Sequence, residues 1–127
     1  MKQFLVLLFV SISTCLFAQT KNDVKFSAVK HTFGKIKHNV PATYTFTFKN
    51  LSASKALIVE SATAECGCTK PEYPQAPVGK GKEGKIKVTY NAANPGAFTK
   101  KVTVKFLNIA EPFILTIDGD VMAATKK

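Results

Sequence analysis

Two cysteines, Cys66 and Cys68, are the residues of this 127-residue sequence whose type and spacing could do chemistry. They flank Gly67 in the phrase Cys-Gly-Cys-Thr, which ends at Thr69. Side chains two residues apart on a strand point to the same face, so the thiols are expected to be neighbours. In a fully extended strand their Cα atoms would lie about 6.6 Å apart, near the upper limit for a disulfide. Gly67 could relax this distance, because glycine adopts backbone conformations that other residues avoid.

Three roles remain open for the pair. It could be an inert pair at a strand end, either reduced or bridged. It could be a reversible thiol–disulfide site, where Lys70 or Lys55 would stabilise a thiolate if either lysine approaches it. It could bind a soft metal, copper(I) or zinc. A disulfide across so short a loop constrains the unfolded chain little, so the fold is not expected to depend on it.

The sequence offers little else for a metal site or for catalysis. Two thiolates make half of a zinc site, and no second Cys-x-x-Cys follows. The other imidazole or soft ligands after residue 18 are His31, His38 and Met122, and lone histidines are more often surface or capping residues. We therefore expect no cofactor and no enzyme. The alternatives are copper or zinc at the cysteines, and a thiol redox activity.

The first 18 residues have the order of a secretory signal peptide: a positive start, an apolar run and a small residue. We predict cleavage between Ala18 and Gln19, and export to the periplasm or the medium. Lipidation of Cys15 is a minor alternative. The apolar run is too short and too interrupted to span a bilayer, and no second apolar segment follows. In an oxidising compartment two thiols this close seldom both stay free.

The charge of the chain is strongly positive, at +10. All 18 basic residues are lysines; without Lys2 the mature chain keeps 17 against 8 acidic residues, a net charge of +9. Arginine, which suits bidentate phosphate and base contacts, is absent, so nucleic acid is not expected as a partner. The lysines alternate along predicted strands, as on a solvated sheet face.

The elements that must position the cysteines are strands, because apolar residues alternate with a period of two. We predict about seven short strands, around residues 24–26, 31–33, 43–48, 57–64, 85–90, 101–106 and 113–118. Residues 70–84 are rich in proline and glycine, and at most residues 69–73 form an edge strand. The economical arrangement is an immunoglobulin-like antiparallel β-sandwich over residues 24–121, with a short tail over residues 122–127. The predicted core is Phe33, Tyr44, Phe46, Phe48, Val59, Ile86, Val88, Tyr90, Val102, Val104, Phe106, Leu115 and Ile117.

Six phrases in order carry a family resemblance: residues 31–36, 44–50, 66–69, 84–90, 94–98 and 117–121. Together they resemble the family called domain of unknown function 1573, an exported immunoglobulin-like β-sandwich family that is frequent in Bacteroidota and similar to sandwich modules of cilia-associated proteins. Thr32 departs from the family, which usually has an acidic residue there. The resemblance implies a fold and a compartment but no activity. We expect a non-catalytic binding or structural module of the bacterial cell envelope. Its partner would be an envelope protein or glycan, bound by strand addition at an exposed edge near the proline-rich loop, or through residues 70–84.

Overall fold

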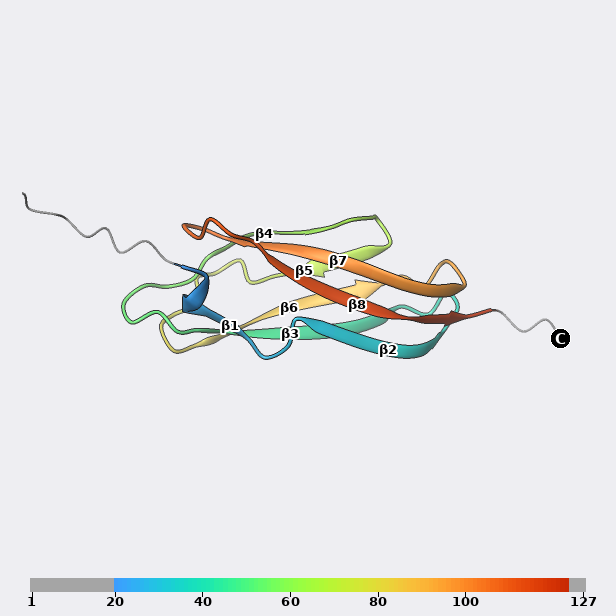
Figure 1. Ribbon diagram of the computed structural model, residues 1–127. Coiled ribbons are helices and arrows are strands. Elements are labelled where there is room, and N and C mark those ends of the chain that lie inside the picture. Colours follow the sequence, from blue (N-terminus) through green and yellow to red (C-terminus); the bar gives the residue numbers. More distant parts are fainter. Residues whose placement is uncertain (1–19, 124–127) are drawn as a thin grey trace, which may run out of the picture.

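The computed structural model describes residues 20–123, which form two four-stranded β-sheets packed face to face (Figure 1). A 3₁₀ turn, Lys21–Asp23, precedes the first strand. Sheet A has the order β1 (Val24–Phe26), β3 (Ala42–Asn50), β6 (Glu83–Tyr90) and β5 (Thr69–Glu72). Sheet B has the order β2 (Lys30–Lys37), β8 (Phe113–Met122), β7 (Gly96–Phe106) and β4 (Val59–Ala64). The predicted all-β sandwich is confirmed, with eight strands rather than seven.

Both ends of the sequence fall outside this description. The predicted signal peptide, with Cys15 and the cleavage site between Ala18 and Gln19, lies outside the described residues, as do residues 124–127 of the predicted tail. Among residues 20–123, the structure contains no helix that is long and apolar enough to cross a membrane.

The prediction of purely antiparallel pairing is wrong at one place, because β2 runs parallel to β8. The chain leaves sheet A after β1, crosses over residues 27–29 and continues in the same direction as an edge of sheet B (Figure 1). The β2 strand also does not stop at Gly34 as expected. Gly34 has a φ of +72° at a register shift between Thr32 and Lys35, so this glycine forms a bulge inside the strand.

The last strand extends through Gly119, where the sequence was expected to close it, and ends at Met122. Gly119 lies within the ladder, and glycine suits this position because two neighbouring groups approach its Cα closely. A Cβ atom at this position would meet the carbonyl oxygen of Gly34 and the ring of Phe98, each at 2.9 Å. The glycine therefore reflects a close approach between β2, β7 and β8 and does not mark a strand end.

The core lies between the sheets and is built mainly from the alternating residues of β3, β6, β7 and β8. Eleven of the thirteen predicted core residues are buried, whereas Phe33 and Tyr44 are only partly buried. The prediction missed these buried residues: Val24, Leu57, Val78, Ala92, Phe98, Ile109, Phe113 and Val121. Several of them lie outside the strands, where no alternating pattern marks them. Leu57 and Val78, for example, form an isolated bridge between two loops.

Asn50, at the end of β3, is a buried polar residue that joins these loops, and it is only 1% exposed. Its side-chain amide donates to the carbonyl oxygens of Lys55 at 2.8 Å and Val78 at 3.0 Å. Its side-chain oxygen accepts from the backbone N–H of Ser52 at 2.9 Å. The side chain therefore takes the place of backbone partners that a loop cannot provide, and it fixes the end of the sandwich opposite the cysteines.

Candidate functional site

The cysteine pair lies in the connection that carries the chain from β4 in sheet B to β5 in sheet A. Cys66 and Cys68 are joined by a disulfide, and their Cα atoms are 5.3 Å apart, inside the range that disulfides ordinarily span. The distance is shorter than the limit of about 6.6 Å for a fully extended strand, because only residues 65–68 are available for the crossing and the chain must turn within them. Gly67 does not have a positive φ, and a Cβ there would meet nothing within 4 Å. The bend therefore does not depend on the conformational freedom of Gly67.

Backbone hydrogen bonds and one buried hydroxyl hold the turn. The N–H of Thr69 donates to the carbonyl oxygen of Cys66 at 3.3 Å, and the N–H of Asn91 donates to that of Cys68 at 2.9 Å. Thr69 is 4% exposed, and its Oγ1 lies 3.9 Å from Sγ of Cys66 and 3.7 Å from Sγ of Cys68. Both cysteines are partly buried, and Cys68 packs against the core. One hydroxyl therefore faces both sulfur atoms.

The two lysines that the sequence indicated differ in their place relative to this turn. Lys55 precedes β4 and Cys66 follows it, so they are at opposite ends of that strand, and Lys70 is an exposed residue of β5. The β4–β7 ladder pairs Ala64 with Val102, and the N–H of Glu65 then donates to the carbonyl oxygen of Lys101 at 3.4 Å. The regular pairing ends here, because the N–H of Lys101 donates to the carboxylate of Glu65 at 2.7 Å.

Lys100 is partly buried, and it alternates with Phe98 and Val102 on the face of β7 that is turned toward the core. A lysine at this core-facing position breaks the alternation of apolar and polar residues in β7.

The candidate metal ligands do not come together with the cysteines. His31 lies on β2 and stacks on Tyr44, with ring centroids 3.7 Å apart. His38 donates from Nε2 to the carbonyl oxygen of Ala93 at 3.0 Å, which makes it the capping residue that the sequence favoured. Met122 ends β8. Over residues 20–123, no three His, Cys, Asp or Glu side chains are placed to hold a metal ion, so the copper or zinc alternative gains no support.

Three glutamates of β4, β5 and the cysteine turn have partners on neighbouring strands. Glu65 accepts a hydrogen bond from the backbone N–H of Lys101 at 2.7 Å, and Glu60 forms an ion pair with Lys105 at 4.0 Å. Glu72 lies 4.0 Å from Nζ of Lys87.

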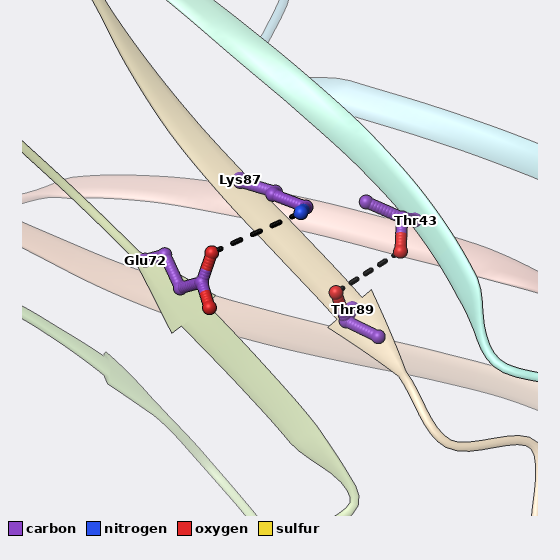
Figure 2. Close-up of polar contacts among 4 residues, drawn as sticks. All are labelled: Thr43, Glu72, Lys87 and Thr89. Carbon is purple, nitrogen blue, oxygen red and sulfur yellow. Dashed lines mark hydrogen bonds and ion pairs between the residues drawn. The ribbon is translucent and has the colours of Figure 1, made fainter.

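The outer face of sheet A carries rows of threonine and lysine. Figure 2 shows Glu72 and Lys87 paired between β5 and β6, and Thr43 and Thr89 with their hydroxyls 3.0 Å apart between β3 and β6. Beside these rows lies an open groove of about 580 Å³, which we call the lysine groove. It is lined by Glu72, Tyr73, Pro74, Ala76, Pro77, Val78, Gly79, Lys82, Glu83, Gly84, Lys85 and Lys87. Apolar loop residues and three lysines therefore share one concave surface.

The outer edge of β5 has few N–H donors for an added strand. The N–H of Asn91 donates to the carbonyl oxygen of Cys68, so these two residues form a hydrogen-bonded pair of the β5–β6 ladder. In an antiparallel ladder such pairs alternate with pairs that are not hydrogen-bonded. Lys70 and Glu72 therefore direct their backbone groups to β6, and Thr69 and Pro71 direct theirs outward. The outward N–H of Thr69 already binds Cys66, and proline has none. The outward carbonyl groups of Thr69 and Pro71 can accept hydrogen bonds from an added strand, and neither residue supplies a free N–H, so strand addition at this edge stays a prediction.

The fold has counterparts among solved structures, all too distant in sequence to show more than the fold. A protein of unknown function from Porphyromonas gingivalis W83 matches with a TM-score of 0.69 at 11% identity, over 87% of this chain and 51% of that one. The chain thus spans about half the length of that protein. PapD-like domain 7 (ASH/PapD-like) of human CEP192 matches with a TM-score of 0.63 at 10% identity, over 81% of this chain and 87% of that one. The VesB protease of Vibrio cholerae matches with a TM-score of 0.62 at 14% identity, over 79% of this chain and 32% of that one.

No curated protein sequence matches the chain. A family model does match, that of a protein of unknown function, DUF1573, over residues 24–121. These residues run from the first residue of β1 almost to the end of β8, and they include the cysteine turn and the lysine groove. The chain therefore belongs to the DUF1573 family, as the phrases in its sequence indicated.

Proposed function

We propose that this chain is a non-catalytic binding module of the bacterial cell envelope, exported by its first 18 residues, whose ligand is an acidic glycan held in the lysine groove. The observation that carries the proposal is the composition of this groove, where Tyr73 and two prolines lie beside Lys82, Lys85 and Lys87. Small-molecule sites commonly combine apolar walls with a few fixed polar groups. A sugar ring that bears a carboxylate offers an apolar face to such walls and a negative charge to the lysines.

The charges of the groove favour an anionic ligand. Three lysines face two glutamates there, and only Lys87 lies close to one of them, at 4.0 Å from Glu72. The pair is about half exposed on both sides, so it holds Lys87 weakly and leaves it free to meet a ligand. The excess of positive charge over the whole chain adds a long-range attraction for anions, which salt screens.

The test is affinity electrophoresis of the purified protein in gels that contain polygalacturonate, with dextran as the neutral control. We expect polygalacturonate, and not dextran, to retard the protein. The double variant Lys85→Gln/Lys87→Gln should lose most of this retardation. The matched variant Lys101→Gln/Lys105→Gln removes the same charge from β7 in sheet B and should keep it.

Two results would overturn the proposal. Equal losses in both double variants would mean that the retardation reports net charge and not the groove. An absence of retardation at low salt would remove the acidic glycan as the ligand class and leave a protein ligand to be considered.

A further inference from the structure

We propose that the acidic glycan is a linear polymer, which runs from the lysine groove across the outer face of sheet A to a second anion subsite at Lys25 and Lys49. This subsite rests on the glycan binding proposed above, because it extends the same ligand site. It adds the length and the path of the ligand, which the lysine groove alone does not determine.

A second hollow adjoins the lysine groove on sheet A. It has a volume of about 220 Å³, and we call it the β1–β3 hollow; it is lined by Lys25, Ser27, Thr47, Phe48, Lys49 and Glu83. Glu83 also lines the lysine groove. In the β3–β6 register, Thr47 of the hollow is directly opposite Lys85 of the groove. The two concave surfaces therefore meet between β3 and β6, and an extended ligand can pass from one into the other.

Two lysines face each other in the β1–β3 hollow. Lys25 pairs with Lys49 across the two strands, and both side chains are exposed, whereas the adjacent residues Val24, Phe48 and Asn50 are buried. Like charges directly opposite each other destabilise a strand pair. The ion pairs within residues 20–123 include neither lysine, so no carboxylate in contact offsets this repulsion. An anion bound between the two ammonium groups offsets it, and the hollow therefore suits a carboxylate ligand.

The acidic side chain at the boundary of the two concave surfaces is Glu83. It lies directly opposite Lys49, it is exposed, and it takes part in none of the ion pairs of the described residues. Five lysines and two glutamates line the combined surface, which leaves an excess of positive charge along its whole length. A polyanion is therefore attracted at both ends and repelled at one point, where it crosses Glu83.

The extent of the combined surface determines the length of the ligand. Lys25 is opposite Lys49, and Lys49 is opposite Glu83, which precedes Lys87 by four residues on β6. With strands about 4.8 Å apart and a rise of about 3.4 Å per residue, the Cα atoms of Lys25 and Lys87 are about 17 Å apart. One sugar ring cannot contact lysines at both ends, whereas a polymer with a carboxylate on each ring can. The ligand class is therefore a linear polyuronate.

The experiment is isothermal titration calorimetry of the purified protein at low salt, with a dimer and a decamer of galacturonate. The subsite variant Lys25→Gln/Lys49→Gln should bind the decamer about three- to tenfold more weakly than the control variant Lys101→Gln/Lys105→Gln, which removes the same charge from sheet B. The dimer fits within the lysine groove, so its affinity should be equal in the two variants. Circular dichroism verifies that both variants are folded.

Removal of the negative charge at the boundary should have the opposite effect. Glu83→Gln should tighten binding of the decamer by about two- to fivefold, because the polymer no longer crosses a carboxylate. The matched variant Glu60→Gln removes the same charge from β4 in sheet B and should give a smaller increase. Equal increases from the two variants would refute the path across Glu83.

The decamer also separates a failure of the subsite from a failure of the glycan function. If the subsite variant and the control variant bind it equally, the second subsite is refuted. The glycan function stands in that case, provided that Lys85→Gln/Lys87→Gln still loses binding. If the wild-type protein does not bind the decamer at all, both proposals fail.

Discussion

Reduction of the Cys66–Cys68 disulfide should leave this protein folded, at a small and calculable loss of stability. In the chain-entropy model, a cross-link across a three-residue loop removes about 5.4 cal/mol/K from the unfolded chain, or about 1.6 kcal/mol at 25 °C. The same model gives about 4.7 kcal/mol for a 100-residue loop. The disulfide therefore belongs to the weakest class of covalent cross-links.

The core provides the contrast. Phe106 is fully buried, and its ring centroid lies 5.1 Å from that of Phe48 and 5.6 Å from that of Phe113. Truncation of such a side chain to alanine costs about 3–5 kcal/mol. Phe106→Ala should therefore destabilise the protein about two to three times as much as loss of the disulfide.

Urea unfolding followed by circular dichroism measures both effects, on the oxidised protein, the reduced protein, Cys66→Ser/Cys68→Ser and Phe106→Ala. With a urea slope of about 1–3 kcal/mol/M, the reduced protein should shift its midpoint by about 0.5–1.6 M at most. A loss above about 3 kcal/mol on reduction would refute the loop-length argument. It would also make the disulfide a structural requirement of the fold.

Two further predictions concern the sheets. A Cβ on Gly84 would meet the ring of Phe48, with Cε1 at 2.6 Å and Cε2 at 2.8 Å, and Phe48 is fully buried. Gly84→Ala should therefore lower the free energy of unfolding by about 1–3 kcal/mol, against less than about 0.5 kcal/mol for Gly67→Ala, and equal urea midpoints would contradict this. A hydrogen bond from the hydroxyl of Thr32, and to a smaller extent the charge of Lys30, holds the pKa of the Asp118 carboxyl below its usual 3.8. The ionised Asp118 therefore stabilises the fold above that pH, and the stabilisation is lost as the pH falls through the lowered pKa. Thr32→Val should be less stable than wild type at pH 7, and thermal melts that keep this gap at pH 2 would refute the reasoning.

Much of the fold follows from local pattern, because a strand shows in its own sequence which side chains are buried. The residues of β6 and β7 alternate between buried and exposed, as their sequence predicts. The turn before β7 follows from the residue types as well, since Gly96 has the positive φ of 111° that the Asn-Pro-Gly phrase requires. The Cys-Gly-Cys-Thr phrase likewise locates the disulfide.

The arrangement around that pair was decided only by the tertiary structure. A period of two shows which residues of a strand face inward, but it does not show which strand lies opposite or in which direction that strand runs. The parallel pairing of β2 with β8 and the crossing of the cysteine turn from one sheet to the other both depend on register between distant segments. Registers are fixed by the packing of the whole core, so the sequence determined the cysteine pair and the folded chain determined its neighbours.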